Sequence, residues 1–179
     1  MREWGVIVIL VLLVGWSTFT IPETEKGAEV VHNGANSFGT TVGEQAPPFT
    51  LKTLEGAAIS QADFEGQPVM INFWATWCPP CRAEMPEMER FYVNHDIEIL
   101  AVNLTSTESS QNDVQEFVEN MDLSFPILLD ETRDIASLYN IQPLPTSLFI
   151  DGEGVIRHVN VGPMNEEMMI RVLENIENE

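Results

Sequence analysis

The sequence predicts an α/β domain, in which helices flank a mixed β-sheet, with one transmembrane helix ahead of it. Three observations support this fold class. From Phe49 onward, short apolar runs alternate with segments of helical spacing, as expected when strands and helices follow one another. Residues 1–21 contain a long uncharged stretch. Residues 43–179 are enough for one hydrophobic core and too few for two.

The N-terminal stretch is predicted to be a membrane anchor. Residues 4–21 carry no charged side chain, and they approach the ~20 residues that cross ~30 Å of hydrocarbon. Trp4 and Trp16 lie near its ends, where interfacial aromatic residues are favoured. A cleaved signal peptide is the alternative, but no small-x-small cleavage site is evident, and Arg2 is offset by Glu3. We therefore expect an uncleaved anchor at residues 1–21, in a bacterial cell membrane, with the rest of the chain exported.

The segment after the anchor and the net charge of the chain limit the kinds of partner that the protein can have. Residues 22–42 are rich in Glu, Gly, Asn, Thr and Ser, which predicts a flexible tether between the anchor and the domain at 43–179. The chain has 28 acidic and 8 basic residues, a formal net charge of −20. Nucleic acid is excluded as a partner, because phosphate binding needs a basic face. Repulsion between copies favours a monomer.

The elements of the domain follow from local patterns. Residues 49–54 alternate, Glu55-Gly56 turns the chain and 57–60 return, which predicts a β-hairpin. After a short helical turn at 61–64, a strand at 69–75 leads into a helix at 79–95. The remaining pattern predicts a strand at 97–104, a helix at 112–121, a strand at 125–129, a helix from an N-cap at Asp130 to Tyr139, a hairpin of strands 146–150 and 155–161, and an amphipathic helix at 165–177.

The two cysteines of the chain, Cys78 and Cys81, stand where the predicted strand passes into the predicted helix. Unpaired N–H groups and the macrodipole at a helix N-terminus stabilise an anion. The pKa of the Cys78 thiol is therefore expected to fall, which would make its thiolate a nucleophile at neutral pH. Two thiols three positions apart, with none elsewhere, point to chemistry between them.

Other uses of such a pair fit less well. A zinc site needs four ligands, and His32, His95 and His158 lack ligand spacing. Covalent haem attachment needs histidine after the second cysteine, where Arg82 stands. An inert bridge remains open, although closing so short a loop constrains the unfolded chain little. A peroxidatic cysteine also remains open, although position 75 is alanine where such enzymes usually have threonine.

The run Trp77-Cys78-Pro79-Pro80-Cys81, set between a strand and a helix and followed by Pro145 ahead of a hairpin, resembles the thioredoxin fold. The resemblance covers nearly all of 43–179. The N-terminal hairpin, a helix–strand insert at about 105–130 and the phrase Asn72-Phe-Trp-Ala-Thr-Trp-Cys78 resemble the membrane-anchored extracytoplasmic thiol–disulfide oxidoreductases typified by ResA, TlpA and CcmG. This resemblance implies dithiol–disulfide exchange at the cysteine pair, with no cofactor and no metal.

The resemblance assigns catalytic roles to three side chains. Cys78 resembles the family's exposed nucleophile, which forms a mixed disulfide with the substrate, and Cys81 would be more buried and resolve it. Glu84 matches a glutamate that lies near the cysteines, raises their pKa values and exchanges protons with them. The alternative for Glu84 is an ordinary solvated helix residue. Asn72 stands where thioredoxin has a buried aspartate, which leaves proton handling to Glu84.

Five neighbouring residues are expected to contact the substrate. Pro145 matches a cis-proline that lies against the sulfurs and pairs with the substrate backbone, and Leu144 precedes it. Trp77 is expected to line the substrate surface. Pro79 and Pro80 suit the first turn of the helix, and they also remove N–H donors that could bind the first sulfur. We expect a less stabilised thiolate as a result.

Together these features predict an extracytoplasmic reductant of disulfides in exported proteins, with an apocytochrome c awaiting haem as one substrate. The resemblance implies that a polytopic membrane thiol transporter supplies its electrons. A disulfide-forming oxidase, a peroxiredoxin-like peroxidase and a redox-inert binding module remain as alternatives. The first two share the fold, and the third would not depend on Cys78.

Overall fold

The structure is a computed structural model that describes residues 38–178. The predicted anchor at 1–21 and the tether up to residue 37 lie outside the described residues. Within residues 38–178, none of the helices has the length and apolar character needed to span a bilayer.

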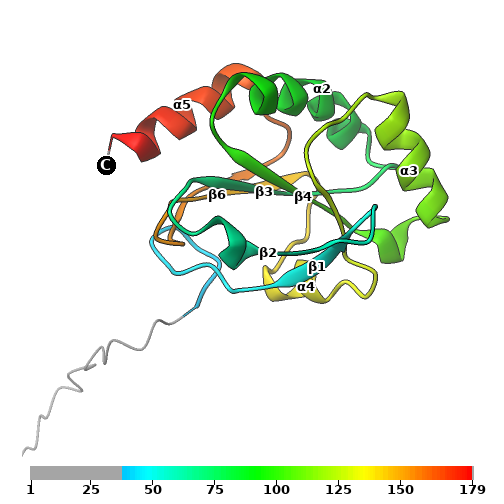
Figure 1. The fold of residues 1–179 in the computed structure, drawn as a ribbon, viewed down its shortest axis with the longest axis horizontal. Coiled ribbons are helices and arrows are strands. Elements are labelled where there is room, and N and C mark those ends of the chain that lie inside the picture. The colour runs from blue at the N-terminus through cyan, green and yellow to red at the C-terminus, as the bar shows by residue number, and fades with distance from the viewer. Residues whose placement is uncertain (1–37, 179) are drawn as a thin grey trace, which may run out of the picture. The chain divides into compact units, whose positions relative to one another are not determined.

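The described chain forms one seven-stranded mixed sheet in the order β2-β1-β5-β4-β3-β6-β7 (Figure 1). Neighbouring strands run parallel between β3 and β4 and between β4 and β5, and all other neighbours run antiparallel. The strands are β1 (Thr50–Thr53), β2 (Ala58–Ser60), β3 (Val69–Trp74), β4 (Glu98–Asn103), β5 (Ile127–Leu129), β6 (Thr146–Ile150) and β7 (Ile156–Val161).

Helices cover both faces of this sheet. They are η2 (Gln61–Phe64), α2 (Pro79–Asn94), η3 (Thr105–Thr107), α3 (Gln111–Asn120), α4 (Asp134–Leu138) and α5 (Glu166–Glu177), where η marks a 3₁₀ helix. Figure 1 shows α2, α3 and α5 on one side of the sheet and α4 on the other. This arrangement confirms the predicted helix–sheet–helix layering.

Strand β3 separates the two halves of the core. Its side chains alternate between faces, as the pleat of a strand requires. Met70 and Trp74 belong to the apolar cluster beneath α2, α3 and α5. Ile71 and Phe73 belong to the cluster on the α4 side. All six residues of β3 are buried, which explains why the sequence there is apolar on both faces except at Asn72.

Most predicted elements are confirmed with ends shifted by a residue or two. The β1–β2 hairpin, the β6–β7 hairpin and α5 are where the patterns put them. The predicted insert is also present, with α3 and β5 following β4 and β5 pairing between β1 and β4. These agreements rest on periodicity, which long apolar segments display clearly.

The predicted N-cap at Asp130 is wrong. Helix α4 begins at Asp134, and its N-cap is Arg133, whose backbone is left-handed and whose side chain caps nothing. The buried Asp130 carboxylate nevertheless accepts the backbone N–H of Ala136 at 2.8 Å and that of Ile135 at 3.4 Å. Asp130 therefore binds N–H groups of the first helical turn, as an N-cap does, but it lies several residues farther back along the chain, because residues 131–133 bend before the helix begins.

The first described residues pair with the domain instead of leading away from it. The N–H of Gly39 donates to the carbonyl of Gln45 at 2.9 Å, and Phe38 forms a bridge with the same residue. The side chain of Glu44 accepts both the N–H and the hydroxyl of Thr41. Residues 38–42 therefore belong with the domain, although their composition suggested a tether.

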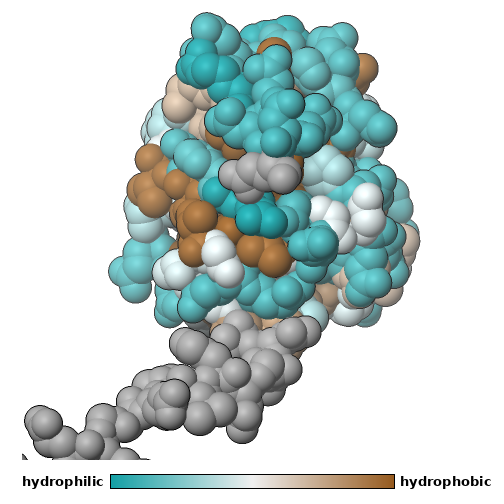
Figure 2. All heavy atoms as spheres, turned by 90° about the vertical axis from the view of Figure 1, so that its left-hand side faces the viewer, coloured by the Kyte–Doolittle hydropathy of each residue, from teal (hydrophilic) through white to brown (hydrophobic). Residues whose placement is uncertain are grey.

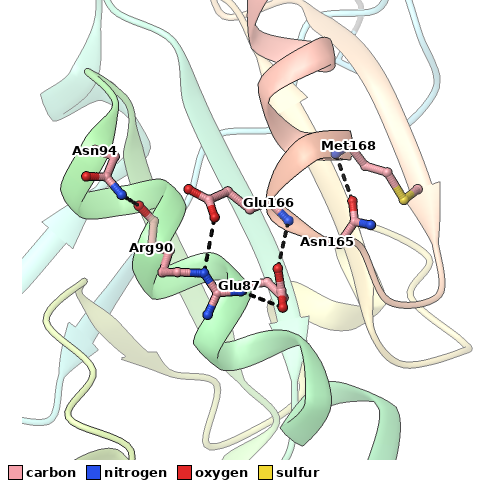
Figure 3. Close-up of polar contacts among 6 residues, drawn as sticks. All are labelled: Glu87, Arg90, Asn94, Asn165, Glu166 and Met168. Atoms are coloured by element: carbon pink, nitrogen blue, oxygen red, sulfur yellow. Dashed lines mark hydrogen bonds and ion pairs between the residues drawn. The ribbon is translucent and has the colours of Figure 1, made fainter.

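Charged residues connect α2 to α5 (Figure 3). Arg90 lies 2.6 Å from Glu87 on its own helix and 3.1 Å from Glu166 at the start of α5. The Glu87 carboxylate also accepts the backbone N–H of Glu166 at 3.1 Å. These contacts fix the beginning of α5, and with it the preceding segment at Met164, against α2. On the face drawn in Figure 2, hydrophilic residues predominate around a smaller patch of hydrophobic ones.

Candidate active site

The two cysteines form a disulfide at the N-terminus of α2. The Cα atoms of Cys78 and Cys81 are 5.3 Å apart, and Cys78 is the N-cap of the helix. Its Sγ atom accepts one hydrogen bond, from the backbone N–H of Cys81 at 3.3 Å. Pro79 and Pro80 occupy the first two helical positions and have no N–H to offer. The sulfur therefore receives a single backbone donor from the first turn.

Both sulfurs are well covered in this oxidised form. Cys78 is 3% exposed and Cys81 is fully buried. The order matches the expectation that Cys81 is the more buried of the two, but Cys78 is much less exposed than expected. An open cavity of about 400 Å³ leads to Cys78. Its walls include four of the five residues expected to contact the substrate: Trp77, Pro79, Pro80 and Leu144.

The fifth expected residue, Pro145, is buried and follows Leu144 through a cis peptide bond, as the resemblance implied. Its carbonyl accepts the N–H of Gly162 at 2.9 Å, which holds the loop before β6 against the end of β7. Trp77 is 55% exposed, and its indole N–H donates to the hydroxyl of Thr107 at 3.1 Å. The cavity, the cis bond and the exposed indole thus lie around the sulfur pair.

Glu84 is buried, which excludes the solvated-helix alternative. Only 1% of it is exposed, one turn after Cys81 on α2. Its Oε1 accepts the backbone N–H of Met164 at 2.8 Å, and its Oε2 accepts the amide of Asn72 at 3.2 Å. Burial raises the pKa of this carboxyl from 4.5 to about 7, and the two hydrogen bonds oppose that rise. Glu84 can therefore gain or lose a proton near neutral pH.

Asn72 joins Glu84 to the neighbouring strand. Its Nδ2 donates to Glu84 and, at 2.9 Å, to the hydroxyl of Ser147 on β6. Its Oδ1 has no hydrogen-bond partner among residues 38–178. A buried acceptor without a partner is unusual. When Glu84 is protonated, a rotated Asn72 amide would offer it this acceptor.

A second carboxylate near the cysteine pair, Glu108, was not predicted from the sequence. Glu108 accepts the backbone N–H of Thr76 at 2.7 Å and its hydroxyl as well, and it also accepts the amide of Asn103 at 2.8 Å. The guanidinium of Arg82 donates to the carbonyl of Thr76 at 3.2 Å. Thr76 is thus held on both sides, two residues before Cys78. No local pattern marks Glu108, because it lies in an irregular polar loop far along the chain.

No group of three or more His, Cys, Asp and Glu side chains in the described part of the chain is arranged to hold a metal ion. The residues that can exchange electrons at this site are the two cysteines, through their disulfide.

Comparison with known proteins identifies the family. The model of the AhpC/TSA family matches residues 42–159. The thioredoxin-like protein YneN of Bacillus subtilis is 39% identical over 97% of this chain and 98% of its own length. The thiol–disulfide oxidoreductase ResA of Halalkalibacterium halodurans is 43% identical over 76% of this chain and 78% of its own. The crystal structure of StoA from Bacillus subtilis is 35% identical and superimposes with a TM-score of 0.64, covering 70% of this chain and 96% of that one.

The resemblance to ResA-like proteins, first seen in the phrase around Cys78, extends over most of the chain and through its fold. With a family model over residues 42–159, a relative similar along almost the whole chain and a cysteine pair at disulfide distance, the chain belongs to the AhpC/TSA family and is a thiol–disulfide oxidoreductase of the thioredoxin fold.

Proposed function

We propose that this protein reduces disulfides in exported proteins on the outer side of the cell membrane, with the oxidised cysteine pair of an apocytochrome c as a substrate. Haem attachment requires free thiols, and an oxidising exterior removes them. A dedicated reductant meets that need.

The observation that supports electron flow from this protein to its substrate is the single N–H donor to the Cys78 sulfur. A strong oxidant is one whose reduced form is stabilised. With prolines at the first two helical positions, α2 offers the Cys78 thiolate few donors. Its reduced form is therefore poorly stabilised, and it gives up electrons readily.

The reaction proceeds in two exchanges. The Cys78 thiolate attacks one sulfur of the substrate disulfide, forms a mixed disulfide and releases the other substrate sulfur as a thiolate. The Cys81 thiolate then attacks Cys78, which releases the second substrate thiolate. Both substrate thiolates take up protons. The substrate has gained two electrons, and the protein is left with the Cys78–Cys81 disulfide that the structure contains.

The other site residues have supporting roles. Glu84 supplies or accepts the proton when Cys81 changes between thiol and thiolate, since its pKa of about 7 suits transfer near neutral pH. Trp77, Pro79, Pro80 and Leu144 form the surface on which the substrate lies. Pro145, through its cis bond, places the preceding Leu144 at this surface.

Location and electron supply complete the proposal. Residues 1–21 anchor the chain, residues after them tether the domain, and a polytopic membrane thiol transporter restores the reduced pair. The protein acts as a monomer. The uncharged stretch at 4–21 and the net charge of −20 support these assignments.

The reduction potential of the pair in the full-length protein tests the direction. Equilibration with defined thiol buffers should give a value near that of thioredoxin, about −270 mV. A value near about −120 mV, where the strong oxidant DsbA lies, would make the protein a disulfide-forming oxidase instead.

A trapping experiment tests the chemistry. Reduced Cys81→Ser protein should accumulate a mixed disulfide with an oxidised apocytochrome c, while Cys78→Ser protein should form none. Peroxide consumption by the Cys81→Ser protein that outpaces its reaction with the disulfide would favour the peroxidase alternative. A phenotype left intact by Cys78→Ser would favour the redox-inert module.

A further inference from the structure

The cavity beside Cys78 contains one charged side chain. Its lining is apolar or neutral except for Arg133, which comes from the turn before α4. The contrast with the whole chain is large, because the formal net charge is −20. A lone positive charge at the cavity that leads to Cys78 is therefore a local exception to an acidic protein.

The backbone holds Arg133 firmly in this place. Its φ is +65°, in the left-handed region that arginine seldom adopts. Its carbonyl accepts the N–H of Ser137 at 3.0 Å. The next turn is fixed by Asp130, which accepts the N–H groups of Ile135 and Ala136. An uncommon conformation that the surroundings maintain is typical of positions with a functional constraint.

Arg133 also differs from the other arginines of the domain. Arg90 and Arg171 pair with glutamates, and Arg157 pairs with Asp151. Arg82 lies over the ring of Phe117 and donates to Thr76. Arg133 makes no ion pair within residues 38–178, and its acidic neighbour Asp134 instead accepts the hydroxyl of Thr132.

We propose that Arg133 is a specificity-determining residue that binds a carboxylate of the substrate, carried by an aspartate or glutamate next to the cysteine that Cys78 attacks. A guanidinium offers a planar pair of N–H donors that match a carboxylate. The apolar residues beside it in the cavity wall, such as Leu104 and Leu144, give the contact a partly desolvated surrounding, while Arg133 itself stays exposed, so the expected gain is modest and sensitive to salt. The inference rests on the proposed reduction of protein disulfides and names the feature that such substrates share.

Matched peptide disulfides test this inference with the full-length, reduced protein. Three peptides differ at one position beside the cysteine, which is Asp, Asn or Lys. We expect the Asp peptide to be reduced about fivefold faster than the Asn peptide at low salt, and the advantage to shrink as salt is added. Arg133→Gln should remove the difference between these two peptides, and Arg133→Glu should shift the preference to the Lys peptide.

The control variant is Arg171→Gln, which removes an arginine of α5 paired with Glu167. It should leave the order of the peptides unchanged. Equal rates for the Asp and Asn peptides with the unmodified protein would overturn the inference. So would an Arg133→Gln variant that slows all three peptides equally, because that pattern marks a structural role. If no peptide is reduced at all, the proposed function itself fails, and the inference fails with it.

Discussion

The carboxylate of Glu108 accepts both the backbone N–H and the hydroxyl of Thr76, two residues before Cys78. The neighbouring Thr107 accepts the indole N–H of Trp77. The loop after β4 therefore holds the chain that leads into the cysteine pair. Because the site lies between a strand and a helix, its precise shape depends on contacts from this separate loop.

Replacing Glu108 with alanine should loosen the approach to Cys78. The change leaves Thr76 and Asn103 without an acceptor, and hydrogen bonds to charged groups contribute about 1.5–3 kcal/mol each. We expect the free energy of unfolding to fall by about 1–3 kcal/mol and disulfide exchange to slow. Urea denaturation and the rate with a peptide disulfide measure the two effects.

Two further variants serve as comparisons. Glu108→Gln keeps an acceptor for the N–H of Thr76 and should lose less stability and less activity than Glu108→Ala. Glu177→Ala removes an exposed carboxylate near the end of α5 and should change neither quantity. If Glu108→Ala is as stable and as fast as Glu177→Ala, the loop is not positioned by this contact.

The buried carboxyl of Glu84 should make stability depend on pH. Its pKa is about 7 in the folded protein and 4.5 ordinarily, so between these values the folded state binds more protons than the unfolded state. The free energy of unfolding should therefore fall as pH rises from about 4.5 to about 7, by on the order of 3 kcal/mol from this group. Urea denaturation of the oxidised protein at pH 5, 6, 7 and 8 measures the slope.

Glu84→Gln cannot titrate, so its stability relative to the unmodified protein should increase across the same window. In the reduced form, the same variant should lower the pKa values of the cysteine thiols, because a nearby negative charge is removed. Glu55→Gln, in the exposed turn between β1 and β2, is the control and should keep the original pH dependence. Unchanged thiol titration curves in Glu84→Gln would reject its proton-handling role.

Asn72→Asp should be strongly destabilising above neutral pH. The change puts a second carboxylate at hydrogen-bond distance from Glu84, in a fully buried position. Two such groups cannot both ionise easily. We expect a loss of more than about 2 kcal/mol at pH 8 and a smaller loss at pH 5. Combining the change with Glu84→Gln should recover much of the stability at pH 8, and no recovery would mean that the two side chains are not coupled.

Asp130→Ala should destabilise the start of α4. The buried carboxylate binds the N–H groups of Ile135 and Ala136, and loss of such a helix-terminal acceptor costs about 1–2 kcal/mol. Asp134→Ala, which removes an exposed side chain from the same turn, should cost little. Thermal unfolding compares the two variants, and equal melting temperatures would contradict the role of Asp130.

The elements of this fold could be predicted from sequence because their patterns are local. The strand at Val69–Trp74 and the helix α5 can each be recognised from the hydrophobic pattern of a single short stretch of sequence. The site was predicted as far as a motif extends, including the cis bond before Pro145. The burial of Glu84 was open, because a single glutamate in a helix does not reveal which face α5 covers.

The remaining differences come from contacts between distant segments. Glu108 and Thr76 are 32 positions apart, and no local sequence pattern near either residue indicates that they are in contact. Asp130 is a residue type that is common at N-caps, but the chain bends again before the helix begins at Asp134. The polar composition of residues 22–42 likewise gives no sign that Gly39 and Thr41 pair with Gln45 and Glu44.

The unequal coverage of the two sulfurs also limits oxidative damage. Where this geometry persists after reduction, peroxide reaches Cys78, which lines the open cavity, and not Cys81, which is fully buried and outside it. The product is a sulfenic acid on Cys78, which further peroxide would convert to the irreversible sulfinic acid. A thiol whose Cα lies 5.3 Å away intercepts it first, forming the disulfide and releasing water. The pair thus returns to a state from which ordinary reduction recovers it.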